Sequence, residues 1–168
     1  MILLTIFVCI VFVLGFVVFR GAPYVPSMKK YAAQSLDELY HVTKKDVLID
    51  VGSGDGVILR LAAERGARAI GYELNPILVL MSKLLSRGNP LVETKLADFW
   101  LTALPAETTV VYAFSVGRDM KKLANKMQQT ATRAQHPIWL ITYGHSIPKL
   151  KPNKSTNSHY LYLFEPKQ

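Results

Sequence analysis

From residue 46 onward the chain alternates short apolar runs with segments that have helical periodicity. Short apolar runs are typical of buried strands, and apolar residues spaced three or four apart are typical of helices that cover a sheet. Strands are predicted over 47–51, 67–74, 91–99, 108–116, 137–144 and 159–166. Helices are predicted over 28–41, 57–66, 75–88 and 119–134. This alternation predicts an α/β fold with a parallel sheet that is covered on both faces.

The first 19 residues form one apolar run, MILLTIFVCIVFVLGFVVF, which contains no ionisable side chain and ends at Arg20. At about 1.5 Å per helical residue this run reaches about 28 Å, close to the ~30 Å hydrocarbon core of a bilayer. We therefore expect a single-pass transmembrane helix. A cleaved signal peptide and a buried core helix are the alternatives, but the run has no basic leading region, no small-residue cleavage pattern and no polar stripe.

Basic residues follow the apolar run, and none precedes it. By the positive-inside tendency, the rest of the chain is expected on the cytoplasmic side, where its positive charge would face an anionic lipid surface. The chain divides accordingly into a transmembrane anchor (1–20), a connector with an amphipathic helix (21–45) and one α/β domain (46–168).

Composition narrows the partners without selecting one. The 168 residues include 20 Lys and Arg against 12 Asp and Glu, which gives a net charge of +8. This charge favours anionic surroundings such as lipid headgroups, nucleic acid or an acidic protein. Cys9, the only cysteine, lies in the apolar run, so no disulfide and no Cys-based zinc site is expected. No metal site of another kind is predicted.

Three glycines, Gly52, Gly54 and Gly56, follow the first strand of the α/β domain in the stretch LIDVGSGDGVIL. Glycine permits positive φ angles and the close approach of a ligand to the main chain, and the next helix is expected to offer free N–H groups. Ligands of open α/β sheets bind at this edge, outside the carboxyl ends of the strands. A tight turn that binds nothing is the alternative for the glycines alone.

Two acidic residues, Glu73 and Asp98, end the second and third strands. A carboxylate at the first position can accept both hydroxyls of a ribose, and Asp98, with Phe99 beside it, can accept from an adenine amino group. Each alone is more typical of a solvated carboxylate, but with the glycines they predict a nucleotide-like cofactor. The third glycine of the dinucleotide pattern G-x-G-x-x-G would fall at Val57, which disfavours NAD.

The motifs DVGSGDG, GYELNP and LADFW resemble those of the seven-strand (class I) S-adenosylmethionine-dependent methyltransferases. The resemblance implies a Rossmann-like, doubly wound, mostly parallel sheet of order 3-2-1-4-5 with one antiparallel edge strand. It also implies S-adenosyl-L-methionine as cofactor, with Asp50 toward its amino group, Glu73 at its ribose, and Asp98 with Phe99 at its adenine. The other cofactor-binding residues that it implies are Gly52, Ser53, Gly54, Asp55, Gly56, Leu74 and Asn75.

A closer resemblance covers nearly the whole chain, because the apolar span, GAPYVPS and DVGSGDG follow one another as in the membrane-anchored protein-lysine methyltransferases. Those known in mitochondria modify the ADP/ATP carrier and the ATP synthase c-subunit, and bacterial relatives exist. We expect a bacterial inner membrane, with the mitochondrial inner membrane as the alternative. The segment before the glycines matters for activity in that family, which makes Tyr24, Pro26 and Ser27 candidates for a lid; a plain linker is the alternative.

The chain departs from this family pattern after the fifth strand. The polar stretch 148–158 is expected to be a mobile loop, so only HYLYLFEP remains for the antiparallel edge. This departure leaves open what forms the far wall of the substrate pocket.

The resemblance implies a lysine in a membrane-associated protein as the methyl acceptor. Transfer from a sulfonium requires in-line positioning and a neutral amine. Tyr112, Tyr143 and His145, at the ends of the fourth and fifth strands, are expected to face the substrate, and no catalytic residue is assigned. A lipid or small-molecule acceptor is an alternative, as is a non-catalytic cofactor-binding protein. Nucleic acid is not expected, because AFSVG stands where base-methylating enzymes carry an Asp/Asn-Pro-Pro-aromatic motif.

Overall fold

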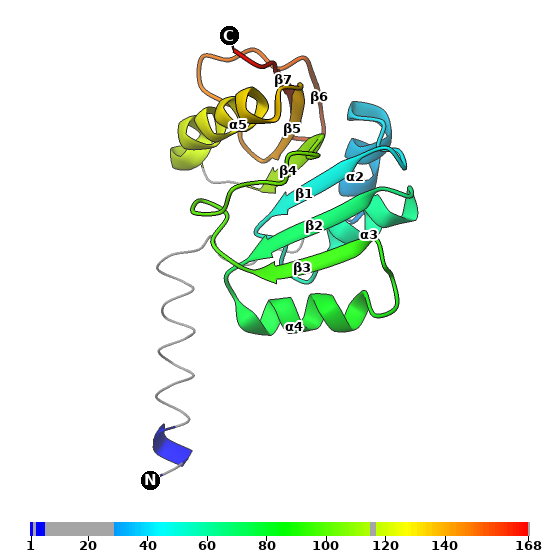
Figure 1. Ribbon diagram of the computed structural model, residues 1–168, viewed down its shortest axis with the longest axis vertical. Helices are drawn as coiled ribbons and strands as arrows, with labels where there is room; N and C mark the ends of the chain where they lie inside the picture. Colours follow the sequence, from blue (N-terminus) through cyan, green and yellow to red (C-terminus); the bar gives the residue numbers. More distant parts are fainter. Residues whose placement is uncertain (2, 6–28, 115–116, 168) are drawn as a thin grey trace.

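The computed structural model describes residues 1, 3–5, 29–114 and 117–167 (Figure 1). These residues form one sheet with the strand order β3-β2-β1-β4-β5-β7-β6 and helices on both of its faces. The strands are β1 (Val47–Val51), β2 (Arg68–Glu73), β3 (Val92–Leu96), β4 (Val110–Phe114), β5 (Ile138–Tyr143), β6 (Lys154–Thr156) and β7 (His159–Phe164). The helices are α2 (Lys29–Gln34), α3 (Val57–Glu64), α4 (Pro76–Leu85) and α5 (Met120–Ala134), with a π-helical turn η1 (Ser35–Leu39) and a 3₁₀ turn η2 (Gly117–Asp119).

Strands β1 to β5 run parallel to one another, which confirms the predicted Rossmann-like, doubly wound order 3-2-1-4-5. Their carboxyl ends lie at one edge of the sheet, called the carboxyl edge below. Strand β7 pairs antiparallel with β5 and places His159 opposite Tyr143, so the first residue of β7 also lies at this edge. The carboxyl edge is therefore the place to look for a site.

Strand β6 was not predicted, and the expectation of a single antiparallel edge strand is wrong. Residues 154–156 pair with β7 through a two-residue turn at Asn157 and Ser158, which have φ angles of 46° and 61°. Positive φ at both positions is the geometry of a type I′ turn, whose twist suits a hairpin. The strand has three residues, all polar and none buried, so it carries no apolar alternation that a pattern search could detect.

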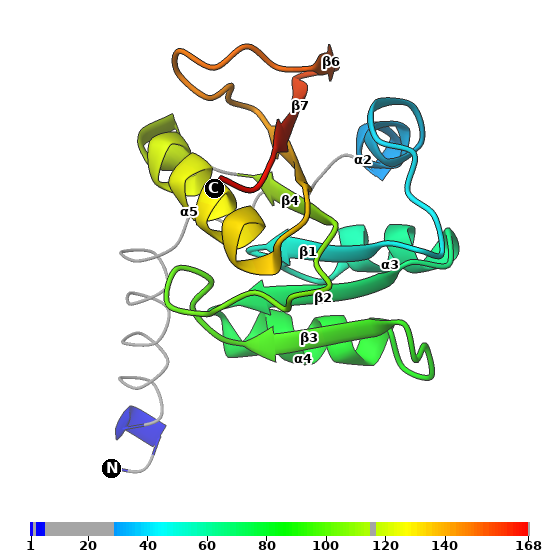
Figure 2. The same cartoon turned by 45° about the horizontal axis from the view of Figure 1, so that its top comes forward.

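The two faces of the sheet carry separate parts of the core. Leu48 and Ile49 are adjacent on β1, point to opposite faces and are both fully buried. On the face of Ile49 the core includes apolar residues of α5, and on the face of Leu48 it includes α2, η1 and α3. Figure 2 shows α5 on one side of the sheet and α3 and α4 on the other. Coverage of both faces explains why the β-strands read as nearly continuous apolar runs.

The predicted helix 28–41 is observed as two shorter elements. It is α-helical in α2 and becomes π-helical at Ser35, whose buried hydroxyl donates to the Ala32 carbonyl at 2.7 Å. Its apolar side chains Ala32, Leu36 and Leu39 are buried against the sheet, as the periodicity predicts. Hydroxyl groups that compete for main-chain carbonyls are a common cause of such local changes in helix geometry.

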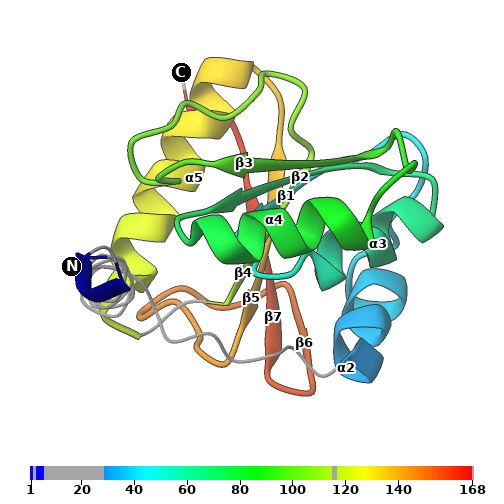
Figure 3. The same cartoon turned by 90° about the horizontal axis from the view of Figure 1, so that it is seen from below.

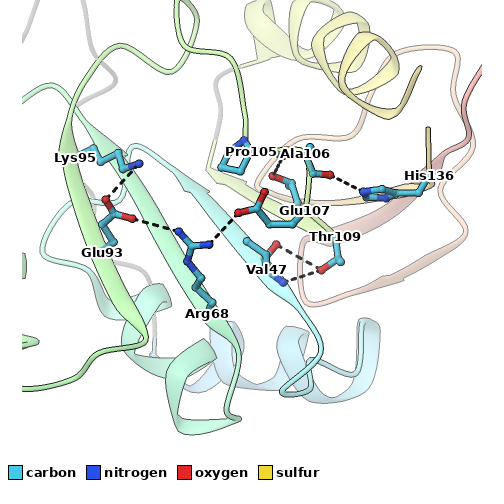
Figure 4. A network of polar contacts seen from close by, with 10 residues as sticks. Val47, Arg68, Glu93, Lys95, Pro105, Ala106, Glu107, Thr109 and His136 are labelled. Atoms are coloured by element: carbon cyan, nitrogen blue, oxygen red, sulfur yellow. Dashed lines mark hydrogen bonds and ion pairs between the residues drawn. The ribbon is translucent and has the colours of Figure 1, made fainter. Parts of the chain in front are cut away.

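The amino ends of the strands carry a polar network (Figure 4). Arg68 at the start of β2 pairs with Glu107 at 2.9 Å and with Glu93 at 3.7 Å, and Thr109 Oγ1 accepts from the Val47 N–H at 3.0 Å. Exposed ion pairs of this kind contribute little stability individually. Arg68, Glu93, Lys95 and Glu107 thus form one network of ion pairs at this end of the sheet.

The predicted anchor and connector lie mostly outside the described residues. This applies to 2 and 6–28, which include the candidate lid residues Tyr24, Pro26 and Ser27. Within the part of the chain that the structure describes, no helix has the length and apolar character needed to cross a membrane.

Candidate functional site

Two of the three glycines in the loop between β1 and α3 have different physical roles. Gly56 has φ of 81°, and a Cβ atom at this position would collide with the Ser82 side chain of α4. Gly52 has φ of 70°, but a Cβ atom here would meet no atom of the described residues within 4 Å. Gly56 therefore serves the packing of α4, whereas Gly52 lies beside open space that a ligand can enter.

Most N–H groups of this loop already have acceptors within the protein. The N–H groups of Gly52 and Ser53 donate to the Tyr72 carbonyl at 2.9 and 3.2 Å, and that of Gly56 donates to the Ser53 carbonyl at 2.8 Å. These loop N–H groups are therefore not free donors; the expectation concerned the N–H groups of the following helix, of which Val57 N–H donates to Asp55 Oδ1 at 3.3 Å. A pyrophosphate needs free donors, so the loop is poorly suited to a dinucleotide.

Glu73, at the end of β2, accepts the loop's remaining central N–H group. Its Oε2 accepts from Gly54 N at 2.9 Å, and its Oε1 accepts from the N–H groups of Leu74 and Asn75 at 2.8 Å each. A carboxylate has about four acceptor positions, so three bonds leave about one for a ligand. Glu73 thus links β2 to the glycine loop, a role that the sequence analysis did not anticipate, and retains capacity for a hydroxyl donor.

Asp50 is a buried carboxyl group on β1, two residues before Gly52, with 3% of its surface exposed. The pKa of Asp50 is raised to about 8. Burial is the largest cause, and the nearby negative charges of Glu73 and Asp55 add to it. None of the groups that shift the pKa of Asp50 is a cation. A positively charged ligand would supply that charge and stabilise the ionised carboxylate, so the site is complementary to a cation.

The residues around these two acids hold the loop and the following helices in place. Arg60 pairs with the Asp55 carboxylate at 3.3 Å, and the Asn75 side chain caps α4 by accepting from the Ile77 N–H at 2.9 Å. The Ser53 side chain is buried and lies where a Cβ atom of Gly71 would be, so it points into the protein. The predicted cofactor residues of this group are therefore brought together at the carboxyl edge.

Asp98 and Phe99 follow β3 at the same edge but differ in exposure. Asp98 is half-buried, and its Oδ1 accepts from the Trp100 N–H at 2.8 Å. Phe99 is 4% exposed and packs between the rings of Tyr72 and Trp100, with the Lys126 ammonium 4.8 Å from its ring centre. The Phe99 ring belongs to the core, and its contact with an adenine stays a prediction.

The predicted substrate-facing residues divide into two groups. Tyr112 is fully buried, and its hydroxyl lies 2.9 Å from His159 Nε2. His159 Nδ1 lies 3.0 Å from the Asn157 carbonyl, so Nδ1 donates there and Nε2 accepts from Tyr112. Tyr143 is half-buried and stacks on the His159 ring with 4.5 Å between ring centres, whereas His145 is exposed.

His159 is the residue of this cluster that the sequence analysis missed. It is 1% exposed, and burial lowers its pKa, so its imidazole is neutral. A histidine that begins a strand gives no signal in the sequence, because its partners come from β4 and β5.

Among the residues that the structure describes, no group of three or more His, Cys, Asp or Glu side chains is arranged to hold a metal ion.

The fold defined by these elements is that of the class I S-adenosylmethionine-dependent methyltransferases. A crystal structure of an RNA methyltransferase from Salinibacter ruber, in complex with S-adenosyl-L-homocysteine, superimposes with a TM-score of 0.74. It shares 26% sequence identity, and the similarity covers 86% of this chain and 95% of that one. Coclaurine N-methyltransferase has the same fold at 14% identity, with a TM-score of 0.58.

Within this class, the chain belongs to the ANTKMT methyltransferase domain family, whose model matches residues 50–154. Similar curated proteins are the lysine N-methyltransferases of the ATP synthase c-subunit. The one from Mus musculus is 35% identical over 109 residues, which cover 63% of this chain and 43% of the relative. The one from Homo sapiens is 32% identical over 110 residues, which cover 64% and 46%. The matched region thus spans less than half the length of these relatives.

Proposed function

We propose that this protein is an S-adenosylmethionine-dependent methyltransferase that methylates a lysine side chain in a membrane-associated protein. The observation that carries the cofactor assignment is the buried carboxyl group of Asp50 beside the open space at Gly52. S-adenosylmethionine has a cationic amino group and a sulfonium; the amino group would favour the ionised form of Asp50, and both positive charges are favoured near the Glu73 carboxylate.

Each acid has its own part in this proposal. Asp50 would hold the cofactor's amino group, and Gly52 leaves room for the methionine portion beside the main chain. Glu73 would use its remaining acceptor capacity for a ribose hydroxyl. Asp98, with Phe99, would hold the adenine. When bound, the cofactor supplies a methyl group on a positively charged sulfur, which makes displacement by a neutral amine favourable.

The acceptor amine would enter near the ends of β4, β5 and β7. The aromatic side chains of Phe114, Tyr143 and His159 gather there, with 5.1 Å between the first two ring centres and 4.5 Å between the last two. Burial of a lysine amine among these rings would remove water from it, and this desolvation disfavours the charged form, which must lose its proton before it can attack. His159 is neutral and held by Tyr112, so it would orient the stack rather than supply charge. Tyr143 and the exposed His145 remain the candidates for contact with the substrate.

The lysine acceptor is supported by the relatives, whose names assign them to the c-subunit of ATP synthase. The structural neighbour from Salinibacter ruber is named an RNA methyltransferase, so the labelling experiment below includes RNA as an acceptor. We further propose that residues 1–20 anchor the protein in a bacterial or mitochondrial inner membrane, that 21–45 connect and that 46–168 form the catalytic domain. The apolar run without ionisable side chains supports this division.

A binding experiment tests the cofactor. The full chain in detergent should gain thermal stability with S-adenosylhomocysteine and none with NAD, because a ligand that binds only the folded state stabilises it. Stabilisation by NAD alone would contradict the proposal. Asp50→Asn serves as the matched variant, since it removes the charge with little change in volume.

A labelling experiment tests the acceptor. Membranes, total lipid and RNA are each incubated with the protein and S-adenosylmethionine that carries a radioactive methyl group. Label in a protein band, recovered as methyl-lysine after hydrolysis, is the expected result. Label in the organic-soluble fraction would assign a lipid acceptor, label in RNA would assign a nucleic acid, and either would replace lysine in the proposal.

A further inference from the structure

Helix α4 has its large apolar side chains on the outside. Ile77, Leu80, Met81, Leu84 and Leu85 are between 43% and 62% exposed. Their spacing of three and four residues places them on one side of the helix, where they form a continuous stripe. We call these five residues the α4 stripe. In Figure 3 no described element covers this side of α4.

The inner side of α4 is small and partly polar. Val79 and Ser82 are its buried residues, and the Ser82 hydroxyl lies 2.7 Å from that of Thr94 on β3. Ser82 also occupies the space that the missing side chain of Gly56 leaves. The helix therefore packs closely on the sheet through small groups, and the exposure of the stripe is a result of this packing.

The stripe extends beyond the helix at its amino end. Leu96 lies two residues after Thr94 on the edge strand β3, so both side chains point to the α4 side of the sheet. Leu96 is 59% exposed. The apolar surface thus reaches the carboxyl edge, where the candidate site lies.

The size of this surface argues against a second copy of the chain as its partner. The stripe consists of five side chains, each about half exposed, on one helix of 10 residues, whereas a stable interface involves about 20–30 residues a side. Stable protein interfaces bury about 800 Å² on each partner. A lipid surface needs no matching shape, and a short helix can bury its apolar side in it.

The charge around the stripe favours an anionic lipid surface. Residues 74–92 contain no Asp or Glu, and they contain Lys83 and Arg87, both exposed beside the stripe. The whole chain has a net charge of +8. Lys and Arg next to an exposed apolar helix face are typical of helices that lie in the headgroup region of a membrane.

We propose that the α4 stripe lies in the headgroup region of an anionic membrane, parallel to its plane. Because α4 begins directly after Glu73, Leu74 and Asn75, this contact would hold the carboxyl edge of the sheet close to the lipid surface. An acceptor that projects only a short distance from the bilayer would then be within reach. The proposal concerns a surface and requires no turnover, so it can fail while the proposed enzyme activity holds, and the reverse.

The test reports on α4 itself, because the apolar run at residues 1–19 could attach the protein to a membrane without it. In a Cys9→Ser background, Leu84→Cys is labelled with a fluorophore that responds to polarity, and the full chain is reconstituted in vesicles that contain phosphatidylglycerol. The label is expected to shift to shorter wavelength and to lose emission about twofold when doxyl-labelled lipids are included. Gln129→Cys, exposed on α5, is the matched control and should show neither effect.

Two further variants separate the apolar and the electrostatic contributions. Leu80→Gln, on the same side of the helix, and the pair Lys83→Glu with Arg87→Glu should each reduce the quenching of the Leu84→Cys label. These side chains are exposed, so thermal unfolding should change little, which checks that the fold is retained. A label at position 84 that stays as solvent-exposed as the one at position 129 would overturn the proposal. Disulfide cross-linking of two Leu84→Cys chains, with no quenching by lipid, would assign the stripe to a dimer and would also overturn it.

Discussion

The raised pKa of Asp50 predicts that binding of S-adenosylhomocysteine releases a proton near neutral pH. At a pKa of about 8, about nine in ten Asp50 carboxyls carry a proton at pH 7. A cationic amino group next to a carboxyl lowers its pKa by about 1–3 units. A shift of about two units leaves about one carboxyl in ten protonated, so binding at pH 7 should release about 0.8 of a proton.

Isothermal titration calorimetry measures this number directly. The apparent binding enthalpy is determined at pH 7 in two buffers with different enthalpies of ionisation, and the slope between them is the number of protons exchanged. Asp50→Asn should bind more weakly and release about 0.8 of a proton less, because position 50 no longer titrates. Equal slopes for the two proteins would refute the assignment of Asp50 to the ligand's amino group.

The same pKa has a consequence for the unliganded protein. Between pH 4 and pH 8 the folded state keeps a proton on Asp50 that the unfolded state releases, so the contribution of Asp50 to the free energy of unfolding should decrease as the pH rises through this range. Asp50→Asn should abolish that decrease, as measured by urea unfolding at several pH values. An unchanged slope in the variant would show that other groups cause it.

Three further outcomes follow from the structure. Gly56→Ala should destabilise the fold by more than Gly88→Ala. Both positions have φ near 80°, so alanine costs about 1–2 kcal/mol of backbone strain at either, but only the Cβ atom at position 56 collides with Ser82. Equal melting temperatures of the two variants would contradict this. Glu73→Gln should lower both the melting temperature and the affinity for S-adenosylhomocysteine, since losing one charged hydrogen bond to the loop costs about 1.5–3 kcal/mol. A loss of affinity with an unchanged melting temperature would show that Glu73 contacts the ligand but does not stabilise the loop. Because burial lowers the pKa of His159, the unfolded chain binds a proton that the folded one does not, and stability should decrease as the pH falls below about 6.5; His159→Phe should reduce this dependence in pH-resolved unfolding.

The periodicity of the sequence was sufficient for most of the fold. Strand β1 has its predicted bounds, and the other predicted strands and helices appear within a few residues of theirs, except that the helix 28–41 divides at Ser35. The reason is that alternating burial on a two-faced sheet is visible locally, as at Leu48 and Ile49. The glycine loop was also visible locally, since the positive φ angles at Gly52 and Gly56 favour glycine in the chain itself.

Other features depended on contacts between distant segments. Strand β6 exists because β7 offers it an edge, and the loop N–H groups are occupied because the Tyr72 carbonyl and Glu73 lie beside them. The pKa of Asp50 follows from burial among elements that no single stretch of sequence specifies.

The partners of single side chains show the same dependence. The burial of Phe99 among core rings and the bond between His159 and Tyr112 join residues from different strands. The sequence by itself therefore determined the order of the elements and the position of the glycine loop. Only the tertiary structure decided which hydrogen-bonding groups remain available to a ligand and which side of α4 faces outward, because both depend on packing across the sheet.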